Sequence, residues 1–285
     1  MKTFDIDCTL VYEVGGPAEF FLQIEVARIP EHTILSESFT VTPATTSTQQ
    51  YEDPNSHNQV RRIHADYGPL KIEYRARVAR SFEPPDRNAR ELAIAELPGE
   101  VMHYLLPTRY CESDLLSGMA QRTFGNIAPG YGRVEAIVAW IREHIHYQIG
   151  QTTATTTARD VLANRVGVCR DFSHVAITMC RALNIPARFV VGHVEFEEPP
   201  PDFHAIFEVF LGGRWLLFDP TGLAPVETVV RIATGQDAKD VAFATIYGPA
   251  RMTDIQPLIT EAVVEQDAAS SAAQQPVVPT EQMAA

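Results

Sequence analysis

The sequence predicts an α+β protein in which an antiparallel β-sandwich is followed by helices packed against a second antiparallel sheet. Two observations support this class. Apolar and polar residues alternate at a period of two in the first part of the chain, and helical periods replace this pattern from residue 113 to residue 183. Strands are expected again after Pro186, which ends the helical pattern. With 285 residues, 45% of them hydrophobic, the chain is long enough for about two domains with buried cores.

Residues 1–105 carry weak helical signals, and we expect them to form the β-rich N-terminal domain. The expected strands are Phe4–Val14, one that begins at Leu22 and is ended by Pro30, Val60–Ala65 and Leu70–Val78. The last two strands are expected to form a hairpin through Gly68-Pro69. The polar segment 41–58 predicts a long loop around at most one short strand. No group of residues in this domain points to a catalytic site. The domain either stabilises the protein or helps to shape a substrate groove.

Residues 106–266 are expected to form a second domain of helices followed by strands. The expected helices are Ser113–Phe124, Arg133–Tyr147, one that starts at the capping box Thr157–Asp160, and Cys169–Leu183. The expected strands are Ala187–Phe196, Phe203–Leu211 and Arg214–Asp219. Gly212-Gly213 predicts a tight hairpin turn between the last two strands. Residues 267–285 carry almost no charge and predict a disordered tail.

The net charge of −13 comes from 23 Lys and Arg against 36 Asp and Glu. Such an acidic chain is a poor partner for nucleic acid or for anionic lipid. No apolar run approaches the roughly 18 residues that a membrane helix needs. Asp5 and Asp7 interrupt the apolar stretch that a signal peptide would require. We therefore expect a cytoplasmic protein with neither a nucleic-acid nor a membrane partner.

The four cysteines are scattered, and no two of them form a C-x-x-C pair. This disfavours a disulfide framework and a structural zinc site, so we expect free thiols, no metal and no cofactor. Cys169 differs from the others because it follows Gly167-Val168 and opens a predicted helix. A helix N-terminus stabilises a thiolate, and its free N–H groups can hold an oxyanion. Cys180, three turns further along that helix, has the apolar neighbours of a core residue.

A nucleophilic cysteine needs a base and a group that orients the base. If Gly212-Gly213 forms the turn, residue 211 pairs with residue 214, and paired residue numbers add up to 425. His204 and Asp219 then lie on one face as diagonal neighbours, about 7 Å apart at Cα and within reach of a hydrogen bond. A register slip of one residue would separate them. The sequence thus predicts a Cys169–His204–Asp219 triad.

Other polar residues near this helix have plain structural explanations. Asp171 fits the positive end of the helix dipole. His174 is five residues beyond Cys169, points elsewhere and is interpreted as structural. His144 and His146 would point away from each other on a helix, which disfavours a metal site.

Five segments resemble the transglutaminase-like superfamily, whose core has a papain-like fold. They read Trp140-Ile-Arg-Glu-His-Ile-His-Tyr147, Gly167-Val-Cys-Arg-Asp-Phe-Ser-His174, Arg181-Ala-Leu-Asn-Ile-Pro-Ala-Arg188, Phe203-His-Ala205 and Trp215-Leu-Leu-Phe-Asp-Pro-Thr221. The chain is similar to bacterial members that have a β-rich region before this core. The resemblance implies acyl transfer through a thioester, with Cys169 as nucleophile, His204 as base and acid, and Asp219 as the group that orients His204.

The chain departs from the family pattern after the His-Ala pair, where many members have an aromatic residue and this chain has Ile206. The second oxyanion donor of the family is not identifiable from the sequence. We expect a peptidase or amidase that acts on a peptide or protein amide. The alternatives are a cross-linking or amine-transferring transglutaminase and a non-catalytic peptide-binding module on the same fold.

Overall fold

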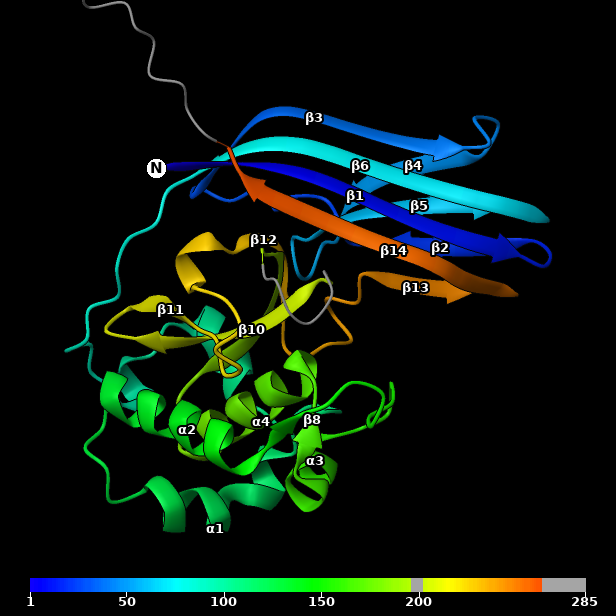
Figure 1. The fold of residues 1–285 in the computed structure, drawn as a ribbon. Coiled ribbons are helices and arrows are strands. Elements are labelled where there is room, and N and C mark those ends of the chain that lie inside the picture. Colours follow the sequence, from blue (N-terminus) through cyan, green and yellow to red (C-terminus); the bar gives the residue numbers. More distant parts are fainter. Residues whose placement is uncertain (196–201, 263–285) are drawn as a thin grey trace, which may run out of the picture.

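The computed structural model describes residues 1–195 and 202–262. In this part of the chain, two four-stranded sheets form a β-sandwich, and a third four-stranded sheet packs against α-helices (Figure 1). The expected α+β class and its N-terminal sandwich are confirmed. The expected disordered tail at 267–285 and the triple proline 199–201 lie outside the described residues.

The sandwich is built from eight strands. One sheet has the order β14-β1-β6-β3 and the other β13-β2-β5-β4. Their bounds are β1 Lys2–Val14, β2 Ala18–Leu22, β3 His32–Thr42, β4 Ser47–Glu52, β5 Gln59–Ala65, β6 Gly68–Arg80, β13 Ala244–Tyr247 and β14 Ala250–Glu261. Alternate residues of β1 are buried, and the ring of Tyr12 meets that of Phe20 from the other sheet at 5.1 Å.

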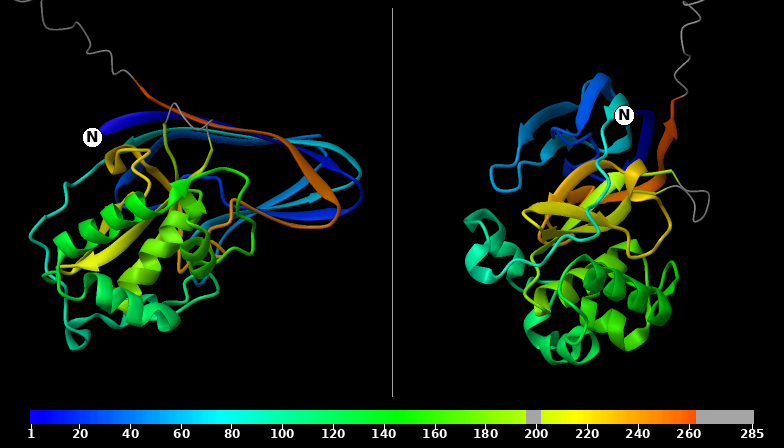
Figure 2. Two further views of the ribbon diagram at one scale, coloured as in Figure 1. Left: turned by 60° about the horizontal axis from the view of Figure 1, so that its bottom comes forward. Right: turned by 90° about the vertical axis from the view of Figure 1, so that its left-hand side faces the viewer.

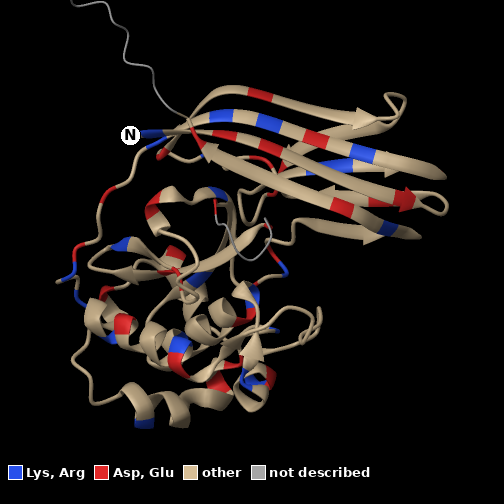
Figure 3. Ribbon diagram, viewed as in Figure 1, with Lys and Arg blue, Asp and Glu red and all other residues tan. Residues whose placement is uncertain are grey.

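The outer face of the first sheet carries charges of both signs (Figure 3). Asp5 lies opposite Arg77 and Asp7 opposite Arg75 in the pairing of β1 with β6. The two ion pairs span 2.6 Å and 3.1 Å. These exposed side chains keep one face of the sheet in water while the other face packs in the core.

Three features of the sandwich differ from the sequence expectations. β5 and β6 do not pair as a hairpin, because β5 pairs with β2 and β4 while β6 pairs with β1 and β3 in the opposite sheet. The second strand ends at Leu22, although Ile24 and Val26 remain buried. The polar region contains two strands, β3 and β4, whose exposed residues leave little hydrophobic pattern to detect.

The chain returns to the sandwich at its C-terminal end. β14 pairs with β1 over eleven positions, and β13 pairs with β2 (Figures 1 and 2). The boundaries expected from the sequence put residues 244–261 into the second domain, whereas the structure uses them as sandwich strands. The division at residue 105 therefore does not separate two continuous segments of chain.

The second half of the molecule has helices on one side of the third sheet. The helices are α1 Ser113–Phe124, α2 Tyr131–His144, α3 Ala158–Asn164 and α4 Cys169–Ala182. The short turns η1 Ile94–Glu96 and η2 Gly99–Leu105 precede them, and η3 Val226–Thr228 comes later. α4 is central and packs against the other three helices and the sheet (Figure 2). Every residue of α4 from Asp171 to Arg181 is buried.

The third sheet has the order β11-β10-β9-β12. Its strands are β9 Ala187–His193, β10 His204–Leu211, β11 Arg214–Phe218 and β12 Val230–Gly235. Leu211 pairs with Arg214 and Phe207 with Phe218, which confirms the predicted register. A separate parallel pair joins β7 His146–Tyr147 to β8 Val166–Gly167. The predicted second helix therefore ends earlier than expected, and Tyr147 belongs to a strand.

The sandwich packs directly against the third sheet. The ring nitrogen Nε2 of His193, at the end of β9, lies 2.9 Å from the carbonyl oxygen of Ile24. The rings of Phe203 and Phe243 are 5.1 Å apart. Both contacts lie next to the start of β10, so the sandwich supports the strand that carries His204.

Candidate active site

Cys169 is the first residue of α4 and differs from the other cysteines in its exposure. Its side chain is partly accessible, whereas Cys8, Cys111 and Cys180 are buried. Burial raises the pKa of Cys8 to about 12 and that of Cys111 to about 11, and it raises the pKa of Cys180 further. Of the four thiols, Cys169 is thus the one that is accessible to solvent and also lies at a helix N-terminus.

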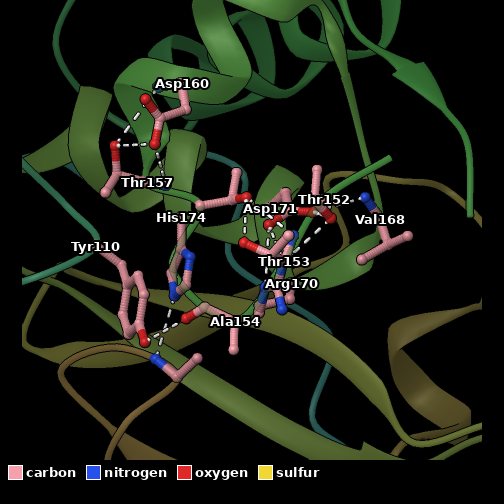
Figure 4. Close-up of polar contacts among 12 residues, drawn as sticks. Tyr110, Thr152, Thr153, Ala154, Thr157, Asp160, Val168, Arg170, Asp171 and His174 are labelled. Atoms are coloured by element: carbon pink, nitrogen blue, oxygen red, sulfur yellow. Dashed lines mark hydrogen bonds and ion pairs between the residues drawn. The ribbon is translucent and has the colours of Figure 1, made fainter. Parts of the chain in front are cut away.

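Asp171 fixes this helix end more firmly than the helix dipole alone would require (Figure 4). Its carboxylate is fully buried. Oδ2 accepts hydrogen bonds from the Val168 N–H at 2.9 Å and from the Thr152 hydroxyl at 2.7 Å. Oδ1 accepts from Nε and Nη2 of Arg170 at 3.0 Å and 2.8 Å. The two residues that flank Cys169 therefore both bind one carboxylate, Val168 through its backbone N–H and Arg170 through its side chain. The same carboxylate also binds Thr152 in the 148–157 loop.

Gly167 is required at this turn because of Asp171. A Cβ atom at residue 167 would lie 2.7 Å from the Cβ of Asp171, closer than carbon atoms approach. The parallel pair β7–β8 also places Tyr147 opposite Gly167. The glycine lets α4 begin close against β7.

His204 and Asp219 meet as the predicted register requires. His204 begins β10, Asp219 directly follows β11, and Nε2 of the imidazole lies 3.1 Å from Oδ2 of the carboxylate. Both side chains are almost completely buried. The second carboxylate oxygen accepts from the Thr221 N–H at 2.8 Å and from its hydroxyl at 2.7 Å. The Ala224 N–H donates to Oδ2 at 3.0 Å.

These contacts move the two pKa values apart. Burial by itself lowers the pKa of His204, but hydrogen bonds to Asp219 and to the Cys169 thiol outweigh burial and raise it from 6.5 to about 9. Burial by itself raises the pKa of Asp219, but its bonds to His204, Thr221 and the Ala224 N–H lower it to about 2. The arrangement therefore favours an imidazolium beside the sulfur and an ionised carboxylate behind it.

Tyr147 is a site residue that the sequence reasoning missed. Its hydroxyl lies beside both the thiol and the backbone amide of Cys169, and its ring packs 5.9 Å from that of Phe172. Burial, together with the neighbouring sulfur, raises the pKa of Tyr147 above its usual value of 10, so the phenol keeps its proton. The residue sits in a segment whose period is helical, and no local signal showed that the chain changes to a strand there.

Two of the histidines considered from the sequence, His144 and His174, make structural contacts. His174 is buried, stacks on Tyr110 at 5.0 Å, and its Nε2 accepts from the Ala238 N–H at 3.1 Å. His144 stacks on Trp140, and its Nδ1 lies 2.8 Å from the Trp140 carbonyl oxygen. His146 lies on β7, beyond the end of the helix that was expected to carry both His144 and His146.

Comparisons with known proteins show which family this fold belongs to. Residues 117–220 match the model of the transglutaminase-like superfamily, and residues 1–100 match that of the N-terminal domain of bacterial transglutaminases. A solved structure from Cytophaga hutchinsonii, provisionally named a cysteine protease, is 35% identical in sequence. It aligns with a TM-score of 0.89 over 93% of this chain and 92% of its own.

The chain belongs to the transglutaminase-like superfamily. Its matched core runs from within α1 to Pro220 and includes Cys169, His204 and Asp219. The C-terminal strands β13 and β14 lie beyond both family matches, although they complete the sandwich that residues 1–100 begin.

Curated relatives of this transglutaminase-like protein occur in mycobacteria and are themselves uncharacterised. One from Mycobacterium leprae is 29% identical over 168 residues, which are 54% of this chain and 58% of the relative. One from Mycobacterium tuberculosis is 34% identical over 109 residues, which are 33% of this chain and 35% of the relative. The chain thus matches less than two thirds of the length of either protein.

Within residues 1–195 and 202–262, no helix combines the length and the apolar character needed to cross a membrane.

Proposed function

We propose that this transglutaminase-like protein is a cysteine-dependent enzyme that hydrolyses amide bonds through a thioester on Cys169. The observation that carries the proposal is His204, whose buried imidazole lies 3.1 Å from the carboxylate of Asp219 and close enough to the Cys169 thiol for the sulfur to help raise its pKa. A peptide-binding module would not need this arrangement. The name of the Cytophaga hutchinsonii structure, a cysteine protease, supports hydrolysis.

The first half-reaction forms the thioester. His204 takes the proton of Cys169, and the sulfur attacks the carbonyl carbon of the amide. The negative charge that develops on the carbonyl oxygen is stabilised by the Cys169 N–H and by the Tyr147 hydroxyl, which lie next to each other. The C–N bond then breaks, and His204 gives its proton to the departing amine.

The second half-reaction releases the acid. Water donates a proton to His204 as its oxygen attacks the thioester carbon. The C–S bond breaks, the product leaves as a carboxylic acid, and the thiolate is restored beside the imidazolium. Asp219 stays ionised throughout, fixes the ring orientation, and stabilises the imidazolium that forms in each half-reaction.

The substrate class we propose is a peptide or protein amide. We also place the protein in the cytoplasm, because all four cysteines are unpaired as expected in a reducing compartment. Neither a nucleic acid nor a membrane is proposed as a partner.

The test combines thiol labelling with turnover. Iodoacetamide followed by mass mapping should modify Cys169 far faster than the three buried cysteines. Glutamine-containing and isopeptide-containing peptides, supplied with and without a primary amine, should be hydrolysed by the wild type and not by Cys169→Ala. Cys8→Ala, which removes a thiol inside the sandwich, is the matched control and should keep activity.

Two outcomes would overturn the proposal. One is that Cys169 is labelled no faster than Cys180, and the other is that Cys169→Ala keeps full turnover. Incorporation of the amine in place of hydrolysis would keep the thioester chemistry and assign the protein to amine transfer.

A further inference from the structure

Arg142 reaches from α2 to the backbone that follows β11. Its Nη2 donates to the carbonyl oxygen of Asp219 at 2.5 Å, and its Nε donates to that of Pro220 at 3.3 Å. Arg142 lies in the last turn of α2, so these bonds join the helical layer to the end of the sheet. No carboxylate is among the hydrogen-bond and ion-pair partners recorded for Arg142 in the described part of the chain.

The backbone that Arg142 holds is the turn that aims the carboxylate of Asp219. Within it, Asp219 accepts three hydrogen bonds from Thr221 and from the Ala224 N–H. The Leu223 N–H donates to the Thr221 hydroxyl at 3.1 Å. Since the side chain is bonded to its own turn, a change in the shape of residues 219–224 would redirect Oδ2 away from His204.

Gly222 permits the close approach of Arg142. Its φ of +75° is a left-handed conformation that side chains disfavour. A Cβ atom there would lie 2.9 Å from Cζ of Arg142 and 3.1 Å from its Nη2. The guanidinium therefore lies directly against the turn, and the glycine leaves the space that it occupies.

We propose that Arg142 is a positioning residue that holds the 219–224 turn so that Asp219 stays bonded to His204. This inference rests on the proposed function, because it assigns Arg142 to the same triad. Arg142 contacts neither the thiol nor the imidazole in any recorded hydrogen bond, so it acts through the turn.

The direction in which the pKa of His204 changes when Arg142 is replaced distinguishes a positioning role of Arg142 from an effect of its charge alone. Among the described residues, the groups that face His204 include Cys169 from α4, Asp219 after β11 and Asp202 before β10, and Tyr147 from β7 faces the same sulfur. Loss of a nearby positive charge would raise the pKa of His204. Loss of the turn geometry would weaken the bond to Asp219 and lower that pKa. The proposal requires the second result.

The experiment measures the rate at which iodoacetamide alkylates Cys169 between pH 5 and pH 10, in the full chain. The upper inflection of this profile reports the loss of the His204 proton. Arg142→Met is expected to lower the pH of this inflection by about one unit, which is the change expected when one charge-assisted hydrogen bond is weakened. Arg142→Lys keeps the charge but cannot bind both carbonyls in one plane, so it should give an intermediate shift. Arg122→Met, an exposed arginine on α1, is the control and should give no shift.

A second variant tests the same contact from the other side. Gly222→Ala should displace the guanidinium and shift the inflection in the same direction. Gly213→Ala has a comparable φ of +88° but meets nothing within 4 Å, so it controls for backbone strain alone. The pair keeps the proposal testable if Arg142→Met does not fold.

An unchanged or raised inflection in Arg142→Met, or equal behaviour of the two glycine variants, would overturn the positioning role. A failure of the proposed function looks different, since Cys169 of the wild type would then react no faster than the buried cysteines.

Discussion

Replacing Asp219 with Asn tests the electrostatics of the site most directly. The folded environment raises the pKa of His204 from 6.5 to about 9, a difference of about 2.5 units and about 3 kcal/mol of preference for the imidazolium. The asparagine keeps the shape of the side chain but removes the negative charge. Burial lowers the pKa of His204, and without the carboxylate less remains to offset this effect, so the pKa should fall.

The magnitude follows from the proton balance of the pair. The thiolate–imidazolium and thiol–imidazole forms differ only in the position of one proton, so each unit lost from the pKa of His204 lowers the ratio of the first form to the second about tenfold. The reaction slows by nearly this factor where the thiol–imidazole form predominates. If Asp219 supplies half of the shift, Asp219→Asn should react with iodoacetamide about 10- to 20-fold more slowly at pH 7. Its upper inflection should fall by more than one unit.

The matched control is Asp202→Asn. Within the described residues, Asp202 is a second carboxylate near His204, and it accepts a 2.7 Å hydrogen bond from the Phe203 N–H. This variant should change the alkylation rate less than threefold. The reasoning is refuted if Asp219→Asn keeps both the wild-type rate and the wild-type inflection, or if the two asparagine variants behave alike.

Three further predictions follow from the same contacts. Tyr147→Phe should lower amide turnover by about 10- to 100-fold, because it removes an oxyanion donor. Iodoacetamide should still alkylate Cys169 within about twofold of the wild-type rate, because that reaction develops no oxyanion. Equal losses in the two assays would rule out this role. Asp171→Asn should reduce the free energy of unfolding, measured in urea, by about 2–4 kcal/mol. The reason is that the buried carboxylate accepts four hydrogen bonds, and an asparagine side chain cannot accept them all. A change under about 0.5 kcal/mol would contradict this prediction. Since the pKa of His204 is raised on folding, its stabilising contribution is complete below pH 6.5 and is lost as the pH rises through about 9; urea unfolding at several pH values should show this loss in the wild type and a weaker one in His204→Gln.

Much of the site was predictable because it depends on local rules. The helix that begins at Cys169 has a clear apolar period and a preceding glycine. The His204–Asp219 contact follows from one turn, because the strand period of two fixes which side chains share a face once Leu211 pairs with Arg214. The capping box of α3 was also readable, and the structure shows Thr157 and Asp160 bonded as expected.

Other features depend on partners that are distant in the sequence. The adjacent strands β5 and β6 read as a hairpin, but their alternating pattern is equally satisfied when each pairs within a different sheet. The return of β14 to β1 joins residues about 250 positions apart, and no local pattern specifies that pairing. Arg142 gave no functional signal, since only the folded chain brings its guanidinium to the turn after Asp219.

The sequence by itself predicted the fold class, the position of Cys169 at a helix N-terminus and the contact between His204 and Asp219, because helix caps and strand register act over a few neighbouring residues. Only the tertiary structure decided which sheet each strand joins, that Tyr147 faces the sulfur, that Asp171 binds the Val168 N–H beside Cys169, and that Arg142 binds the backbone at Asp219. These features depend on long-range packing, in which many partners of similar chemistry could satisfy the same local pattern.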